Sequence, residues 1–105
     1  MIEDIAAVDQ LDDILKVDGI DVFFVAPGDL SQSMGLLGRP FHPDVTAVMD
    51  GVIQKTIAAG RTQGTPATLD TIDHFLEQGA RFIMTGWPAW VTSGAKDFLS
   101  KIPGS

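Results

Sequence analysis

The feature that most constrains the fold of this 105-residue chain is the continuous apolar run at residues 22–25. Val, Phe, Phe and Val follow one another there with no polar residue between them. An unbroken run of this kind is typical of a strand buried on both faces, as in a parallel sheet covered by helices. We therefore predict a strand over residues 21–26 and a parallel α/β fold around it.

Strand and helix patterns alternate along the rest of the chain. Apolar residues at helical spacing predict helices over residues 8–17, 43–59, 69–78 and 89–101. Further strands are predicted at residues 1–3, 62–67 and 82–84, and a long Gly-rich loop at residues 27–41. About four strand–helix units in a row imply right-handed crossovers and a parallel sheet. The predicted architecture is half of a (β/α)8 TIM barrel, in a single domain over residues 1–105.

Several residues are expected to mark helix ends. Asp9 is placed to cap the first helix, and Gly19 to terminate it. Pro43 suits the first turn of the second helix, which should stop at Gly60, and Gly79 should end the third.

Composition excludes several classes of function. A formal net charge of -7 and the lack of a Lys/Arg patch argue against binding to nucleic-acid backbones and anionic membrane surfaces. With no cysteine, the chain has neither disulfides nor thiolate metal ligands, and its apolar stretches are too short to span a bilayer. With 45% apolar residues it can form a core. We expect a soluble, cytoplasmic protein.

Two carboxylates stand where short apolar runs end. Glu3 closes the run at the amino terminus, and Asp29 lies in the turn after the strand at residues 21–26. In an α/β fold, carboxylates at the mouths of neighbouring parallel strands can hold a hard divalent cation and leave coordination positions open for a substrate. The pattern predicts a metal site.

Met1-Ile2-Glu3, residues 17–31 (VDGIDVFFVAPGDLS), Met34-Gly35 and the segment at residues 42–45 (HPDV) together resemble one known family. They are similar to the second half of the HpcH/HpaI aldolases, the metal-dependent 2-keto-3-deoxy acid aldolases, which include 4-hydroxy-2-oxoheptanedioate aldolase. The resemblance covers essentially the whole chain, and the separation of Glu3 and Asp29 is the family's separation.

This resemblance implies a site and a chemistry. Glu3 and Asp29 would bind Mg2+, Mn2+ or Co2+, which would chelate the keto and carboxylate oxygens of pyruvate. Backbone amides at Gly28 and Asp29 would hold the substrate carboxylate. The implied function is that of a class II aldolase, a carbon–carbon lyase acting on 2-keto acids through a pyruvate enolate, with an aldehyde as the second reactant.

The chain also departs from the family. The family's Arg, His and Gln partners have no counterpart here, and Met1 stands at the Gln position. Residues 85–90 (TGWPAW) replace a Gly-Ser-Asp-like turn. His42 is interpreted as a helix-entry residue and His74 as a solvated helix residue, so we identify no catalytic acid or base and expect the isolated chain to be poorly active.

Two functions from different classes remain open. One is the enzyme, with this chain supplying the metal-binding half of the active site. The other is a non-catalytic half-barrel, a fragment or assembly module that retains at most weak binding of metal and 2-keto acids. In either case four parallel strands leave two open edges and an uncovered inner face, so we expect a homo-oligomer, a dimer or higher. The residues expected on its buried surface are Val22, Phe24, Ile83 and Trp87.

Overall fold

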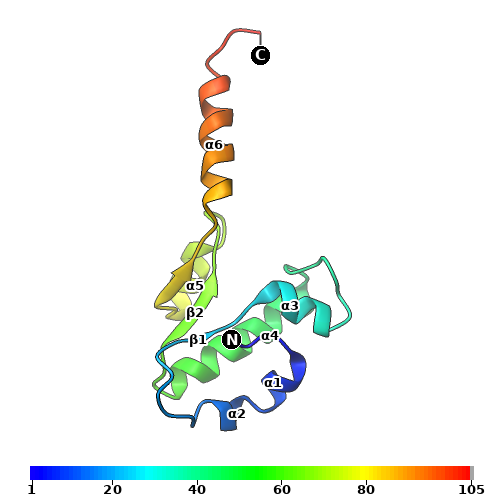
Figure 1. Cartoon of the computed structure of the whole chain (residues 1–105), viewed down its shortest axis with the longest axis vertical. Helices are drawn as coiled ribbons and strands as arrows, with labels where there is room; N and C mark the ends of the chain where they lie inside the picture. The colour runs from blue at the N-terminus through cyan, green and yellow to red at the C-terminus, as the bar shows by residue number, and fades with distance from the viewer. Residues whose placement is uncertain (105) are drawn as a thin grey trace.

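The computed structural model describes residues 1–104 of the chain as alternating helices and strands (Figure 1). The elements in chain order are α1 (Ile5–Asp9), α2 (Leu11–Ile14), β1 (Phe23–Phe24), α3 (Pro27–Ser33), α4 (Pro43–Ala58), β2 (Gln63–Pro66), α5 (Ile72–Gln78), β3 (Phe82–Met84) and α6 (Trp87–Leu99). None of the helices in residues 1–104 has the length and apolarity that crossing a bilayer requires.

The strands form a parallel sheet in the order β1-β2-β3. Ile2 adds an isolated parallel bridge to Val25 at the outer side of β1. Strand positions therefore follow the chain from one edge to the other, with each crossover carrying helices. This arrangement confirms the predicted parallel sheet and partial barrel, although Ile2 contributes a single bridge and not a full strand.

Helix α4 is the centre of the core. Its length and its ends at Pro43 and Ala58 agree with the predicted helix at residues 43–59. His42 caps it, because the ring Nδ1 accepts a hydrogen bond from the Asp44 N–H at 3.2 Å, which confirms His42 as a helix-entry residue. One apolar face of α4 packs with the outward-facing side chains of the strands. The buried apolar residues of α4 and β1 are Val45, Met49, Val52, Ile53, Phe23 and, just beyond β1, Val25.

Arg61 fastens the segment that leads into β1. Its guanidinium donates hydrogen bonds to the carbonyls of Leu15, Val17 and Ile20 at 2.8, 2.9 and 3.1 Å. It also lies 4.7 Å from the centre of the Phe23 ring, within the range of a cation–π contact. One side chain thus satisfies three loop carbonyls and covers a core aromatic ring.

The predicted loop at residues 27–41 is wrong in its first half, because residues 27–33 form α3. Pro27 occupies the first helical turn, where its fixed φ and missing N–H carry no penalty. Pro43 occupies the equivalent position at the start of α4. The Gly-rich composition of the segment concealed it.

The first helix also differs from its prediction at residues 8–17. It begins at Ile5 and is capped by Asp4, whose Oδ1 accepts a hydrogen bond from the Ala6 N–H at 2.7 Å. Asp9, predicted as the cap, is the last residue of α1, and a second short helix, α2, follows after Gln10. Asp4 and Asp9 each precede apolar residues, and the sequence alone did not distinguish which of the two caps the helix.

The inner face of the sheet is open. A Cβ placed on Gly64 would point at the side chains of Val22, Phe24 and Phe82, so these share one face of the sheet. The Phe24 and Phe82 rings meet edge to face at 6.2 Å. Phe82 and Met84 are about half exposed, whereas Ile83 packs against the core on the opposite face. The prediction of Ile83 for the inner face is therefore wrong, because alternate residues of a strand point to opposite sides.

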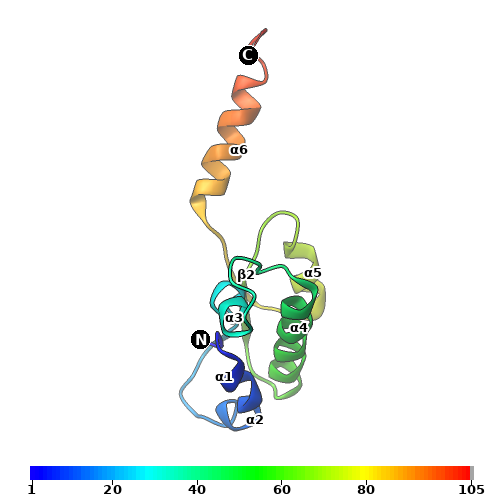
Figure 2. The same ribbon diagram turned by 90° about the vertical axis from the view of Figure 1, so that its right-hand side faces the viewer.

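Helix α6 leaves the body of the molecule. It extends away from the sheet as a single arm, and turning the molecule by 90° shows no other element beside it (Figures 1 and 2). It begins at Trp87, two residues earlier than predicted, with Pro88 in its first turn. None of its residues is buried. The arm accounts for the elongated outline of 58 × 28 × 21 Å.

Candidate functional site

Glu3 and Asp29 line the same cavity. Glu3 follows the bridge residue Ile2, and Asp29 lies in the first turn of α3, just after β1. The cavity has a volume of about 590 Å³, and its lining consists of polar or charged residues: Glu3, Asp4, Asp29, Gln32 and Ser33. The structure thus brings together the two carboxylates that the sequence singled out. Their role as metal ligands stays a prediction.

Backbone hydrogen bonds hold the two segments side by side. The Ile2 N–H donates to the Phe24 carbonyl, at 2.6 Å, and the Ala26 N–H donates to the Ile2 carbonyl at 2.9 Å. Ile2 itself is buried, with 3% of its surface exposed. Glu3 directly follows Ile2, and Asp29 follows Val25, the bridge partner of Ile2, by four residues. The bridge therefore places both carboxylates near the carboxyl-terminal edge of the sheet.

The donor set suits a hard divalent cation. Three carboxylates line the cavity, but Asp4 already accepts the Ala6 N–H as the cap of α1. Glu3 and Asp29 remain, together with the side-chain amide of Gln32. Within residues 1–104, no group of three or more His, Cys, Asp or Glu side chains is arranged to hold a metal ion. Two carboxylates with water or substrate as the other ligands still match the oxygen coordination that Mg2+ prefers.

Two backbone N–H groups beside this cavity lack an intrahelical acceptor. Pro27 is the first residue of α3, and Leu30 is the first to donate back, to the Ala26 carbonyl at 3.1 Å. The N–H groups of Gly28 and Asp29 lie between them, and Ala26 has no side chain that could cap them. A Cβ on Gly28 would meet nothing within 4 Å, so the chain leaves open space at this position.

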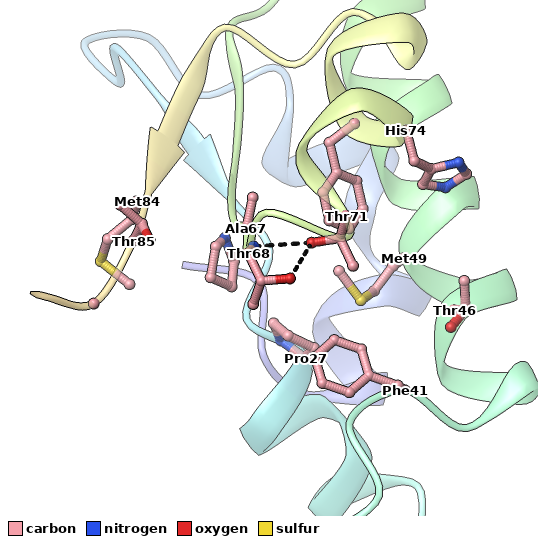
Figure 3. Close-up of a pocket in the computed structure, with 13 residues that line it drawn as sticks. Pro27, Phe41, Thr46, Met49, Ala67, Thr68, Thr71, His74, Met84 and Thr85 are labelled. Atoms are coloured by element: carbon pink, nitrogen blue, oxygen red, sulfur yellow. Dashed lines mark hydrogen bonds between the residues drawn. The ribbon is translucent and has the colours of Figure 1, made fainter. Parts of the chain in front are cut away.

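A second cavity, also of about 590 Å³, opens beside the carboxyl ends of β2 and β3 (Figure 3). Apolar side chains dominate its lining, among them Pro27, Phe41, Met49, Phe75 and Met84. Thr68 and Thr71 form its polar corner, where the Thr71 Oγ1 accepts the Thr68 N–H at 2.9 Å and lies 3.2 Å from the Thr68 Oγ1. Helix α5 begins at Ile72, three residues later than predicted, after turns in which the Thr71 and Ile72 N–H groups donate to the Thr68 carbonyl. The cavity can enclose an apolar group but offers no carboxylate.

Neither histidine lines the carboxylate cavity. His42 caps α4, and His74 lies on α5, where its Nε2 is 3.3 Å from Asp50 Oδ1 and 2.9 Å from Gln78 Nε2. The lining of the carboxylate cavity also includes no arginine. That this chain supplies no catalytic acid or base stays a prediction.

Sequence reasoning missed three residues of the carboxylate cavity: Asp4, Gln32 and Ser33. Ser33 lies one helical turn after Asp29, a spacing that carries meaning only when residues 27–33 are recognised as a helix. Pro27 was the signal that could have identified this helix.

Comparisons with known proteins identify the family. The family model described as HpcH/HpaI aldolase/citrate lyase matches residues 1–93. A hydroxypyruvate/pyruvate aldolase of Cupriavidus necator is 40% identical over 85 residues, which is 80% of this chain and 32% of that protein. A 4-hydroxy-2-oxo-heptane-1,7-dioate aldolase of Salmonella paratyphi B is 41% identical over 86 residues, covering 81% of this chain and 33% of that protein. The chain thus spans about a third of the length of these relatives.

Solved structures show the same fold. A HpcH/HpaI aldolase/citrate lyase family protein from Burkholderia cenocepacia superposes with a TM-score of 0.87 at 30% identity. The superposition covers 95% of this chain and 40% of that chain. Sequence and structure agree, and the chain belongs to the HpcH/HpaI aldolase/citrate lyase family.

Proposed function

We propose that this chain supplies the metal-binding part of a class II aldolase site that acts on 2-keto acids such as pyruvate. The observation that carries the proposal is the shared cavity of Glu3 and Asp29 at the carboxyl-terminal edge of the sheet. Its two carboxylates would hold Mg2+, Mn2+ or Co2+. When bound, such an ion supplies positive charge that stabilises an enolate oxygen.

The chain's own residues bind and orient the substrate. The N–H groups of Gly28 and Asp29 lie free of intrahelical acceptors and would donate hydrogen bonds to the substrate carboxylate. The open space at Gly28 leaves room for this approach. Gln32 would contribute an amide at the rim of the same cavity. Both relatives named above carry aldolase names, which supports a 2-keto acid as the ligand.

The direct test is enolisation of pyruvate. We expect the chain with Mn2+ to accelerate exchange of the pyruvate methyl protons in deuterated water. Mass spectrometry measures the deuterium that pyruvate takes up. This test needs no aldehyde. Asp29→Asn should abolish the acceleration because it removes one of two anionic ligands. Asp73→Asn is the matched control, since Asp73 occupies the first turn of α5, also a seven-residue helix, and does not line the carboxylate cavity.

Metal binding gives a second measurement. Calorimetric titration with Mn2+ should show weak binding that requires both Glu3 and Asp29, because a site with two protein ligands depends on water or substrate for the rest. Full affinity in Asp29→Asn would contradict the site.

The rate of complete aldol cleavage distinguishes the enzyme from a non-catalytic module. A positioned acid or base contributes about 10²- to 10⁴-fold, and the carboxylate cavity is lined by no histidine or arginine. The isolated chain should therefore be a poor aldolase even where it enolises pyruvate. A chain that binds metal and pyruvate without any enolisation would favour the alternative function, a half-barrel module that serves assembly.

The open inner face of the sheet favours a second copy of this chain as the partner. Val22, Phe24 and Phe82 share one face of the sheet, and Phe82 is about half exposed on it. An exposed apolar face commonly marks a site of contact with another protein surface. We expect light scattering at low micromolar concentration to report a dimer or a larger assembly. A cooperative, well-folded monomer would contradict this expectation.

A further inference from the structure

Ser33 joins the two segments that carry the carboxylates. Its hydroxyl accepts a hydrogen bond from the Ile5 N–H at 3.0 Å and donates one to the Leu30 carbonyl at 2.9 Å. The first partner lies 28 residues away in the chain, at the start of α1, whereas the second lies within α3. Ser33 is half-buried and lines the same cavity as Glu3 and Asp29.

The bond to Ile5 completes the capping of α1. The first N–H groups of a helix have no acceptor within it. In α1 the Ala6 N–H donates to the Asp4 side chain at 2.7 Å, and the Ile5 N–H donates to Ser33. A distant side chain therefore caps the Ile5 N–H, two residues after Glu3, and Asp4 caps the Ala6 N–H.

Together with the bridge at Ile2, this bond closes a ring. From Ile2 the chain runs through Glu3 to Ile5, crosses to Ser33 by the hydrogen bond, and returns through α3 to Ala26. The Ala26 N–H then donates to the Ile2 carbonyl at 2.9 Å. Glu3 lies on one side of this ring and Asp29 on the other. The ring therefore sets the separation of their backbones.

We propose that Ser33 is a positioning residue that sets the distance between the Glu3 and Asp29 carboxylates, a role that rests on the proposed function of that pair. The Ile2 bridge alone fixes one end of the ring. Without the Ser33 hydroxyl, the segment that carries Glu3 can swing about that bridge, and the two ligands are no longer held for one ion. Groups that hydrogen-bond directly to a metal ligand change metal affinity by about 10- to 100-fold when altered. Ser33 bonds to the backbone two residues from Glu3, so we expect an effect at the lower end of that range.

The experiment uses Mn2+ alone as the probe and the full chain as the protein. Ser33→Ala should weaken the Kd for Mn2+, measured by calorimetry, by about tenfold. Ser33→Thr should retain affinity close to that of the unaltered chain, because a threonine hydroxyl can bond to the Leu30 carbonyl three residues earlier and still accept the Ile5 N–H. In the metal-free protein, amide hydrogen exchange at Ile5 should quicken in Ser33→Ala and not in Ser33→Thr.

Ser100→Ala is the matched control. Its hydroxyl makes the same kind of bond, to the Asp97 carbonyl three residues earlier at 2.7 Å, at the far end of α6. It should leave the Kd unchanged. Unfolding in urea, measured on every variant, separates loss of stability from loss of affinity: a merely structural serine would lower the free energy of unfolding without changing the Kd of the folded protein.

Each remaining outcome has a distinct meaning. Unchanged Mn2+ affinity in Ser33→Ala, alongside lost binding in Asp29→Asn, would overturn the positioning role and leave the metal site intact. Equal weakening in Ser33→Ala and Ser33→Thr would also overturn it, since the bond to Ile5 would not be the cause. Absence of Mn2+ binding by the unaltered chain would overturn the proposed function and the positioning role together.

Discussion

Helices α4 and α6 have similar sequences in one respect and opposite environments. Each is long, begins with a proline in its first turn and carries apolar residues at helical spacing. In α4 that face is buried against the sheet, and Val52 is 1% exposed. In α6 the matching residues stand in solvent, and Val91 is 59% exposed. The large apolar residues exposed on α6 include Trp87, Trp90, Val91 and Phe98.

The difference shows what an amphipathic pattern does and does not specify. It states that one face of a helix requires a partner. It does not state whether that partner is the helix's own sheet, as for α4, or a surface outside the described chain. The same holds for Phe82 and Met84 of β3, which directly precedes α6 in the chain: both are about half exposed, and their partner surface is not specified by the sequence.

The largest expected difference between the two helices comes from a matched pair of valines. Val52→Ala removes two buried methyl groups from the core and should lower the free energy of unfolding by about 2 kcal/mol. Val91→Ala should change it by about 0.5 kcal/mol or less, because the side chain is largely solvated. Urea denaturation of both variants measures the contrast. Equal losses would mean that α6 is packed against a partner in solution.

Two glycines give the next largest contrast. Gly79 ends α5 with φ of +101°, and a Cβ there would lie 3.0 Å from Ile57 Cδ1. We expect Gly79→Ala to destabilise the protein by about 1–2 kcal/mol. Gly94 lies inside α6, where an added methyl group would meet nothing within 4 Å, so Gly94→Ala should favour the helix by about 0.5–1 kcal/mol. Thermal unfolding followed by circular dichroism should show opposite signs, and a loss in Gly94→Ala would indicate a close contact on α6.

The smallest expected effect concerns an exposed ion pair on the body of the protein. The Lys16 ammonium lies 2.7 Å from the Asp13 carboxylate, and its hydrogen bond lowers the pKa of Asp13. A carboxyl group with a lowered pKa in the folded state stabilises the protein at pH values above its unfolded pKa, and this contribution is lost as the pH falls through the folded pKa. Asp13→Asn should therefore reduce stability slightly at neutral pH and flatten its acid dependence.

The control for this pair lies on α6. Within residues 1–104, Asp97 forms no ion pair at salt-bridge distance, so Asp97→Asn removes a carboxylate without breaking an ion pair and should leave the free energy of unfolding at neutral pH unchanged. Urea denaturation between neutral pH and pH values below the usual aspartate range measures both variants. A steeper acid dependence in Asp13→Asn would contradict the assigned sign.

The sequence predicted most of the sheet and its helices because their signals are local. The apolar run at residues 22–25 identified β1, and Pro43 with Gly60 bounded α4 closely. The predictions were wrong where an element's bounds depend on contacts with residues distant in the sequence. Which Asp caps the first helix depends on where the chain leaves the bridge at Ile2, and no local spacing encodes that.

The site divides in the same way. Glu3 and Asp29 were found because each ends an apolar run, and the structure places both in one cavity. Ser33 and Arg61 were not found, since their partners lie 28 residues away and between 41 and 46 residues away. A hydrogen bond between residues so far apart leaves no periodic pattern in the sequence. Only the folded arrangement reveals which serine and which arginine hold the chain.

The Ile2 bridge would couple the proposed metal site to a local opening of the chain. Two hydrogen bonds join Ile2 to the edge of β1, so the first residues can detach at a fraction of the free energy that unfolds the α4 core. Detachment would separate Glu3 from Asp29 and remove the proposed site, while most of the core stays folded. A ligand that binds only the closed form lowers the open population by mass action. Metal concentration would then control the fraying of this segment at the sheet edge, and protection of the Ile2 amide against hydrogen exchange would report metal occupancy.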